Sequence, residues 1–350
     1  MTYIEKHNNK EIQEYFKILS SDYPVFIDKY INTKEMQRLG GIGQFCGCDY
    51  TNLHSIKYWY SRLDHSVACA LMTWHFTKDK VQTLGALFHD LGTPVFSHCV
   101  DYLFKDFINQ ESSEKSIKDV ILKATDILNY LKEDNINIDS VTNISQYTVV
   151  ENKKPKICVD RLEGIIGTGL VWGHFWSIED IEKIFNDIII LTNEDQEKEI
   201  GFSTIQLAND FFEGVYKYSV MLQQNEDKFT MQFIADCLKE LIDDNILTIE
   251  DLYDFSEQDI ITIIKVNKKT KLKWNNFVNA NTLIKTEEEP VNNYYISIDC
   301  KKRYVVPLIE DNEKVIRLNK ISKQCEELLG KYLTYSDTKY AYIEFWNHEY

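Results

Sequence analysis

Apolar residues recur at helical spacing along the first three quarters of the chain. Between Ser203 and Leu222 they fall near every third or fourth position, which is the pattern of one face of an amphipathic helix, and the spacing returns over residues 231–242. Helix starts are marked by a Ser or Thr with an acid three residues later in the segments Ser177–Asp180, Thr248–Asp251 and Ser256–Asp259. These patterns predict a mainly α fold over most of residues 1–262.

The pattern changes after Lys265, where a stretch rich in Lys, Asn and Thr begins. Apolar and polar side chains then alternate over residues 295–300 with the period of a β-strand, and a second β-prone run covers residues 304–306. We expect these two runs to form a small hairpin, closed by a helix near Lys314–Leu329. The chain is therefore expected to have three parts: an N-terminal helical lead-in over residues 1–30, a helical catalytic domain over 31–262, and a small α+β region over 263–350.

Composition and charge narrow the classes of partner. With 350 residues, of which 44% are hydrophobic, the chain can bury a sizeable core. Its 39 Lys and Arg against 55 Asp and Glu give a formal net charge of −16, which argues against nucleic acid or an anionic membrane as a partner, because both favour a basic surface. No stretch approaches the roughly 20 apolar residues that span a bilayer, and the start lacks an apolar signal-peptide core, so we expect a cytoplasmic protein.

The eight cysteines are too dilute for a disulfide scaffold. Cys46 and Cys48 form the only close pair, and one residue separates them instead of the two to four that are usual in metal sites. Free thiols in a reducing compartment are the expected state.

Histidines are concentrated in one part of the chain. Five of the eight fall between His54 and His98, and histidine is both a common metal ligand and the usual general acid or base near neutral pH. His65 begins one apolar helical run, and another ends in His89 and Asp90. A buried, uncompensated Asp90 would be strongly unfavourable, so we expect a cation nearby, and a divalent metal meets that requirement.

A further acidic residue, Asp160, follows the apolar run Ile157–Val159. Two His and two Asp on three different helices suit a borderline or hard divalent ion with open positions for water and substrate. The predicted ligands are His65, His89, Asp90 and Asp160. Mixed nitrogen and oxygen ligation does not choose between Mn, Mg, Fe, Zn, Co and Ni.

Arginine is scarce, so its placement is informative. Of five arginines, Arg62 stands three residues before His65 and Arg161 directly follows Asp160. Guanidinium groups bind phosphate in a bidentate manner, and their position beside predicted metal ligands indicates a phosphorylated substrate.

The order and context of these ligands resemble those of the HD-domain metal-dependent phosphohydrolases, which implies an HD-type helical bundle. Residues 89–101 look like the deoxynucleoside triphosphate triphosphohydrolase branch of that superfamily, which includes the vertebrate sterile-alpha-motif and HD-domain protein. Residues 36–47, 245–253 and 302–308 are similar to further segments of this branch, so the resemblance extends from about residue 30 to about residue 320.

The resemblance also implies roles for individual residues. It makes His65, His89, Asp90 and Asp160 the ligands of one divalent ion per chain. Arg62 would then contact the substrate phosphates, and His98 would act as the general acid with Asp101 holding its ring. A carboxylate three residues along a helix favours the protonated imidazole.

Further residues are expected to bind the substrate, again by resemblance. Gln44 would contact the sugar, Phe45 would stack on the base, and Arg161 would contact a phosphate. The family also forms homo-oligomers, and we expect one here.

Several positions depart from the triphosphohydrolase pattern. Thr93 replaces a second histidine of that segment, and residues 111–118 lack the histidine expected there. Gly164 and Thr168 replace a Tyr and an Asp that help to read the deoxyribose. The predicted metal ligands are kept while the sugar and phosphate contacts are altered, which favours a phosphohydrolase and weakens the assignment to deoxynucleoside triphosphates.

We therefore expect a metal-dependent phosphohydrolase whose substrate is a nucleotide or other phosphorylated small molecule, with release of nucleoside and tripolyphosphate as the first hypothesis. A nucleotidase or other phosphomonoesterase of the same fold is an alternative. A di-iron oxygenase would need additional histidines, and few lie between His98 and Asp160. A non-catalytic nucleotide sensor is the remaining alternative, against which the retained ligands and His98 argue.

Overall fold

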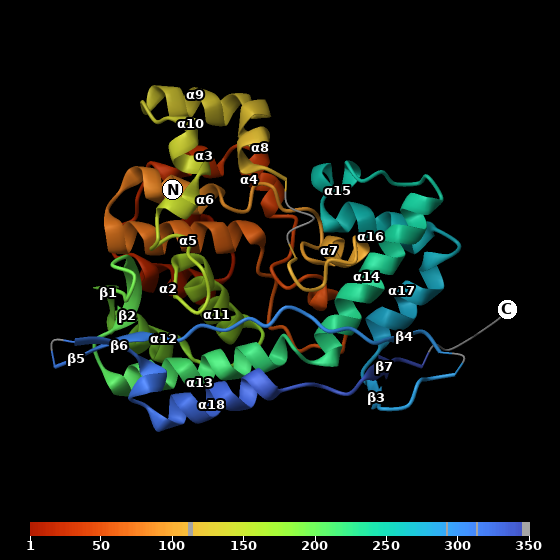
Figure 1. Ribbon diagram of the computed structural model, residues 1–350. Helices are drawn as coiled ribbons and strands as arrows, with labels where there is room; N and C mark the ends of the chain where they lie inside the picture. The colour runs from red at the N-terminus through yellow and green to blue at the C-terminus, as the bar shows by residue number, and fades with distance from the viewer. Residues whose placement is uncertain (111–114, 292, 313, 345–350) are drawn as a thin grey trace.

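The computed structural model describes all residues except 111–114, 292, 313 and 345–350 (Figure 1). About 53% of the chain is helical, which confirms the mainly α prediction. The helices of the described residues are α1 Tyr3–Lys6, α2 Lys10–Leu19, α3 Ile27–Ile31, α4 Lys34–Leu39, α5 Arg62–Thr77, α6 Lys80–Phe88, α7 Cys99–Leu103, α8 Ile117–Lys123, α9 Thr125–Glu133, α10 Ile138–Thr142, α11 Val159–Val171, α12 Ile178–Asn186, α13 Ile205–Met221, α14 Asn225–Asp243, α15 Asp251–Asp254, α16 Glu257–Val266, α17 Thr270–Asn279 and α18 Lys323–Thr334, with short 3₁₀ turns at η1 Cys48–Tyr50, η2 Ile144–Gln146 and η3 Leu318–Lys320.

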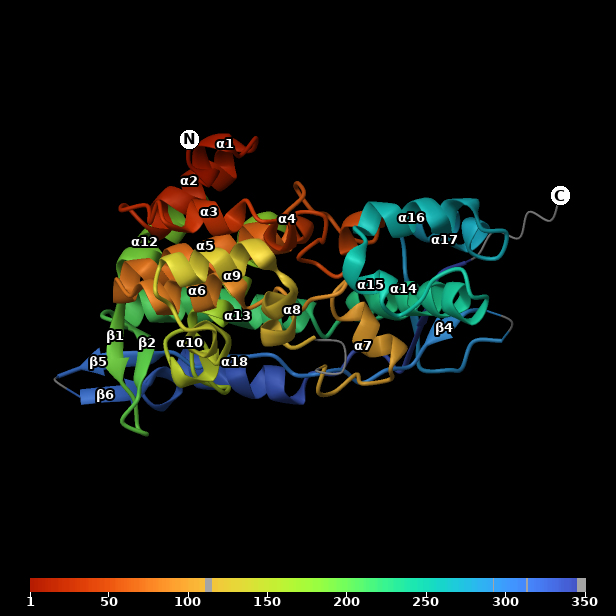
Figure 2. The same cartoon turned by 90° about the horizontal axis from the view of Figure 1, so that it is seen from above.

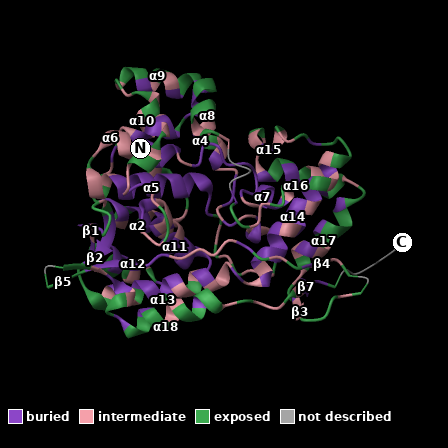
Figure 3. Ribbon diagram, in the orientation of Figure 1, coloured by how far each residue is buried: buried purple, intermediate pink, exposed green. Residues whose placement is uncertain are grey.

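Helix α5 is the central element of the fold. Every residue from Arg62 to Thr73 is buried, and the helix packs against α2, α6 and α11 (Figure 3). A helix that is apolar nearly all round is stable only when neighbours cover every face. Its start is fixed by a capping box, in which the Ser61 hydroxyl accepts from the Asp64 amide while the Asp64 carboxylate accepts from the Ser61 amide. It ends at Thr77, and the next residue, Lys78, adopts a left-handed conformation.

A second group of helices lies beside this bundle. Figures 1 and 2 show α14, α16 and α17 gathered at the opposite end of the molecule from α5, α6 and α12, with α7 next to the second group. Helix α7 packs against α14, and α16 packs against α17. Because α7 directly follows His98, this packing fixes where that side chain stands.

Two small sheets complete the fold. The strands are β1 Ile188–Thr192, β2 Lys198–Phe202, β3 Ile284–Thr286, β4 Tyr295–Ile296, β5 Leu308–Asp311, β6 Lys314–Arg317 and β7 Tyr340–Tyr342. One sheet has the order β1-β2-β5-β6, with β2 and β5 parallel and the other pairs antiparallel. The other has the antiparallel order β3-β7-β4 and packs against α14.

The helix starts predicted at Ser177 and Ser256 are confirmed as capping boxes, and the long amphipathic stripe is α13. The segment from Thr248 supports only the single turn of α15. Strands β1 and β2 fall within the region expected to be helical, because a short apolar run such as Ile188–Leu191 has no periodicity that separates strand from helix.

The predicted C-terminal hairpin is wrong in its position. Only Tyr295 and Ile296 of the first run form a strand, and its partner is β7; residues 304–306 form none. The hairpin is β5–β6, and the helix begins at Lys323 instead of Lys314. The backbone amides of Lys301 and Val306 donate to the carbonyls of Phe107 and Pro155, which are not strand partners. The division into three parts stays a prediction.

Arg317 joins the hairpin to the rest of the fold. Its guanidinium donates to both carboxylate oxygens of Glu199, at 2.6 and 2.8 Å, and to Glu194 at 3.1 Å. Glu199 is fully buried, so Arg317→Ala would leave a buried carboxylate without its charged partner. We expect the free energy of unfolding, measured with denaturant, to fall by about 3–5 kcal/mol.

The matched control is Lys323→Ala, because this side chain is 86% exposed. Its unfolding free energy should stay within about 0.5 kcal/mol of the parent protein. An Arg317→Ala protein as stable as the control would show that the ion pair does not hold the hairpin in place.

Candidate metal centre and active site

Three predicted ligands converge from three helices. His65 lies in the first turn of α5, His89 directly follows α6, and Asp160 lies in the first turn of α11. Nε2 of His65 is 3.1 Å from both Nε2 of His89 and Oδ1 of Asp160, and the His89 to Asp160 distance is 3.5 Å. The His65 side chain is 2% exposed and that of Asp160 is 37% exposed, so the cluster opens to solvent on the Asp160 side.

Hydrogen bonds at the other ring nitrogens orient both imidazoles. Nδ1 of His65 donates to the Glu163 carboxylate, and Nδ1 of His89 donates to the carbonyl oxygen of Ala86 at 2.7 Å. In the neutral ring each Nε2 is then a lone pair directed at the cluster. These short distances between two nitrogens and a carboxylate oxygen require positive charge among the three groups, either as a proton on a ring or as a metal ion. The residues therefore fit a divalent metal, whose histidine ligands are commonly oriented by such contacts.

The electrostatics of the cluster agree with this reading. Burial alone lowers the pKa of His65, but the neighbouring Cys69, Glu163 and Asp160 raise it well above its ordinary value. Burial raises the pKa of Asp160, yet the hydrogen bonds to His65 and His89 outweigh it and hold that pKa well below the usual range. The surrounding groups thus favour positive charge at this point.

Asp90 is placed differently from the other three. Its Oδ2 is 3.7 Å from Nε2 of His89 and accepts from Nη1 of Arg62 at 3.1 Å, and its Oδ1 accepts from the Thr93 hydroxyl. Burial raises the pKa of Asp90, but Arg62 and the two histidines hold it below its ordinary range. The sequence argument that its burial requires a metal was incomplete, because Arg62 supplies a cation. Its role as a ligand stays a prediction.

Two residues of the cluster were missed by the sequence analysis. Cys69 lies one turn after His65, with its sulfur 3.8 Å from Nε2 of that ring, and it belongs with His65, His89 and Asp160 to a group that could hold a metal ion. The signal was a His and a Cys four residues apart on one helix. Glu163 is fully buried and also accepts from the hydroxyls of Tyr60 and Tyr15 at 2.6 and 3.1 Å. The sequence feature that could have revealed Glu163 is its position as an acidic residue within the apolar run of α11.

A tight turn carries the chain from Asp90 to His98. A Cβ at Gly92 would lie 2.0 Å from the carbonyl oxygen of Lys115, so only glycine allows this approach. Arg62, on α5, contacts this turn, because its Nε donates to the hydroxyl of Ser97 at 3.0 Å. Arg62 therefore connects Asp90 with the residue that precedes His98.

His98 and Asp101 are paired as predicted, with Nδ1 of His98 2.9 Å from Oδ2 of Asp101. The guanidinium of Arg303, which the sequence analysis did not select, lies 3.2 Å from the other ring nitrogen, Nε2. Burial lowers the pKa of His98 to about 4, and the charges of Arg303 and Arg62 add to this, although Asp101 opposes it. Asp101 favours the protonated ring as expected, but burial and the two arginines outweigh its effect on the pKa of His98.

The three residues predicted to contact the substrate, Gln44, Phe45 and Arg161, differ in their burial and in their present contacts. The side-chain oxygen of Gln44 is buried and has no hydrogen-bond partner among the described residues. Phe45 is 4% exposed and packs against Tyr60 and Trp172. The guanidinium of Arg161 contacts Glu151 and Asn152 and donates to the Lys156 carbonyl. Their contacts with a substrate stay predictions.

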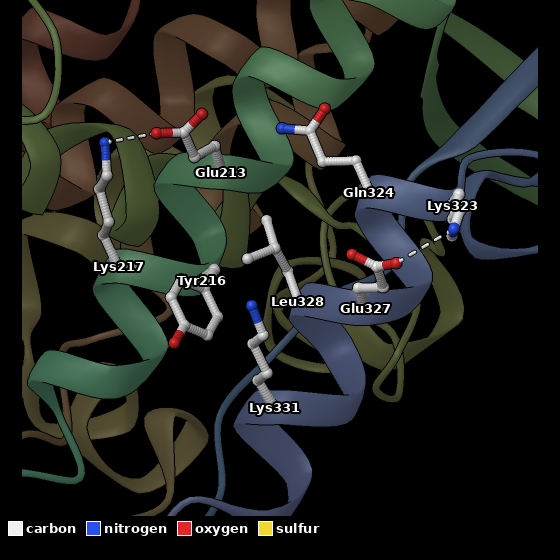
Figure 4. A pocket seen from close by; sticks show the side chains of 8 residues that line it. All are labelled: Glu213, Tyr216, Lys217, Lys323, Gln324, Glu327, Leu328 and Lys331. Atoms are coloured by element: carbon white, nitrogen blue, oxygen red, sulfur yellow. Dashed lines mark ion pairs between the residues drawn. The ribbon is translucent and has the colours of Figure 1, made fainter.

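Two hollows of the surface lie elsewhere. One, of about 500 Å³, runs between α13 and α18, where Glu213 pairs with Lys217 and Lys323 with Glu327 (Figure 4). The other, of about 420 Å³, is lined by residues 48–52 and by parts of α16 and α17. Neither is lined by a predicted metal ligand. Among the described residues, no helix has both the length and the apolar character that crossing a membrane requires.

Comparisons with known proteins give distant similarities. No protein-family model matches the chain. It is 22% identical to the uncharacterised protein YdhJ of Bacillus subtilis over 248 residues, or 70% of this chain and 73% of YdhJ. It is 25% identical over 165 residues to cns2 of Cordyceps militaris, described as a metal-dependent phosphohydrolase. That alignment covers 47% of this chain and less than half, 46%, of cns2.

The fold has a counterpart among solved structures. A hypothetical protein from Aquifex aeolicus superposes with a TM-score of 0.53 at 13% identity, covering 90% of both chains. This likeness concerns the fold alone. Together with the His and Asp cluster, the similarity to cns2 supports a metal-dependent phosphohydrolase of the HD type as the general class, and nothing finer.

The Glu163 carboxylate provides a test of the metal centre. Glu163→Gln keeps the shape of the side chain but removes the charge that orients His65, so we expect the affinity for Mn²⁺ to fall by about 10–100-fold. Competition with a chromophoric chelator measures it. Glu182→Gln, an exposed position on α12, is the matched control and should bind as the parent does. Equal affinity of the two variants would contradict the assignment of Glu163.

Proposed function

We propose that the protein is a metal-dependent phosphohydrolase that acts on a nucleotide. The convergence of His65, His89 and Asp160 carries the proposal, because two imidazole nitrogens and a carboxylate oxygen that meet at one point are a suitable ligand set for a divalent ion. Asp90 is the expected fourth ligand, and Cys69 is near enough to join them. A bound divalent ion supplies Lewis-acid chemistry, polarising a phosphoryl oxygen and making water more acidic.

The residues around the centre suit hydrolysis at phosphorus. Arg62 is held by Asp90 and Ser97 and offsets negative charge on the non-bridging oxygens of the phosphoryl group. His98 is the proposed acid, and it donates a proton to the departing oxygen from Nε2 while Asp101 holds Nδ1. An anionic oxygen of the substrate close to Nε2 would favour the protonated ring of His98. Without substrate, the surroundings of His98 favour the neutral ring.

Within this class, a deoxynucleoside triphosphate is the first candidate substrate, with nucleoside and tripolyphosphate as products. A nucleotidase acting on monophosphates is the alternative. Gly164 bears on the sugar of the substrate and not on its number of phosphates, because it lies one turn after Asp160 and a Cβ there would meet no atom within 4 Å. This open space, where the triphosphohydrolases have a Tyr, favours a substrate that differs in its sugar. The homo-oligomer stays an expectation.

The test is product analysis by chromatography with Mn²⁺, Mg²⁺, Co²⁺ or Ni²⁺ and a panel of ribo- and deoxyribonucleoside mono-, di- and triphosphates. Intact tripolyphosphate plus nucleoside would support the first substrate, and single phosphate from monophosphates the nucleotidase. His89→Ala should abolish turnover by loss of the ion, whereas His75→Ala, a histidine at the exposed end of α5, should not. Absence of turnover by metal-loaded protein would favour a sensor and contradict the hydrolase.

The variant His98→Ala tests the role of the general acid independently of metal binding. We expect the variant to bind the metal as the parent does and to lower kcat by about 10²–10⁴-fold, because only proton donation to the leaving group is lost. Metal content by mass spectrometry and steady-state kinetics measure the two effects. Normal turnover by His98→Ala would exclude His98 as the acid.

A further inference from the structure

The segment Cys300–Val306, here called the strap, connects two loops that adjoin helices α7 and α11, near whose starts the predicted residues His98 and Asp160 lie. On one side, the Lys301 amide donates to the Phe107 carbonyl at 3.1 Å, in the loop that follows α7. On the other side, the Val306 amide donates to the Pro155 carbonyl at 2.8 Å, in the loop that leads into α11. The strap therefore lies across the loops attached to His98 and to Asp160.

Helix α18 holds the strap in place. The hydroxyl of Tyr332 accepts from the Arg303 amide at 2.9 Å. The ammonium of Lys302 donates to the carbonyls of Leu333 and Tyr335, at 2.5 and 3.2 Å, where it meets the negative end of the helix. These contacts of the Arg303 amide and of Lys302 fix the backbone at Arg303, so the starting point of its side chain is also fixed.

The Arg303 side chain is aimed at the predicted acid. Its Nη2 lies 3.2 Å from Nε2 of His98 and donates to Oε1 of Gln110 at 2.5 Å. Among the described residues no carboxylate forms an ion pair with it, whereas Arg62 pairs with Asp90 at 3.1 Å. A guanidinium that is not paired with a carboxylate retains donors with which to bind an anion.

We propose that Arg303 binds an anionic oxygen of the substrate's phosphate chain, on a phosphoryl group other than the one held at the metal centre. The inference rests on the proposed function and makes the substrate a di- or triphosphate. Arg62 is tied to Asp90 and serves the phosphoryl group at the metal. Arg303 reaches His98 from a different segment of the chain, and the phosphate oxygen would replace its contact with Nε2 of His98.

Direct binding to metal-loaded protein tests this without turnover. Calorimetry with Mn²⁺ present would compare tripolyphosphate with orthophosphate for the parent protein, Arg303→Gln and Arg303→Lys. We expect Arg303→Gln to bind tripolyphosphate about 10–100-fold more weakly, with Arg303→Lys between the two, because a hydrogen bond to a charged group is lost. Orthophosphate binding should change less than about threefold.

Lys154→Gln is the matched control, because Lys154 also contacts the strap, through the Lys302 carbonyl at 3.2 Å, but not His98. It should bind tripolyphosphate as the parent does. Equal affinity of Arg303→Gln and the parent, or an equal loss in Lys154→Gln, would overturn the role of Arg303. Failure of the proposed function would instead appear as absence of turnover in the parent protein, whatever the binding results.

Discussion

Three acceptor atoms facing one another inside a helical bundle are the constraint on which the site depends. His65 and Asp160 lie on α5 and α11 and His89 directly follows α6, so the charge among them acts on the packing of three helices. A shared positive charge, from a ring proton or a metal ion, attracts all three groups and ties the helices together. The same ion that serves the proposed chemistry would thus stabilise the fold that positions it.

The orientation of this centre extends to the N-terminal helices. Glu163 holds Nδ1 of His65 and is itself held by hydroxyls from Tyr60, just before α5, and Tyr15, on α2. A carboxylate that accepts these bonds in a buried place has little freedom to move. The expected lead-in over residues 1–30 therefore contributes to the rigidity of the metal centre, and not only to covering the core.

The sequence predicted the parts of the site that follow from local pattern. His65, His89 and Asp160 each stand at the start or end of a buried helix, and this pattern together with the family resemblance placed them in one predicted site. Glu163 and Arg303 were missed for different reasons. Glu163 lay within an apolar run and was passed over as part of the helix, whereas Arg303 reaches His98 from 205 residues away, which no local pattern reveals.

The C-terminal error has the same origin. Alternation over residues 295–300 indicates an extended backbone, but it does not say which partner accepts its hydrogen bonds. Here the extended chain continues as the strap, whose amides bond to two loops of the helical part. Whether this segment forms a hairpin or the strap depends on its hydrogen-bond partners in the folded protein, which the periodicity of a single sequence cannot identify.

The distribution of charge follows from this arrangement. The chain carries a net charge of −16, which opposes the approach of any phosphate, so binding depends on cations gathered at one point. Arg38 donates to the carbonyls of Leu91 and Thr93 in the turn after Asp90, beside Arg62. With Arg161 next to Asp160 and Arg303 at His98, four of the five arginines surround the predicted active site, and only Arg317 serves the sheet. An acidic protein that places its few arginines in this way concentrates its guanidinium groups at one site.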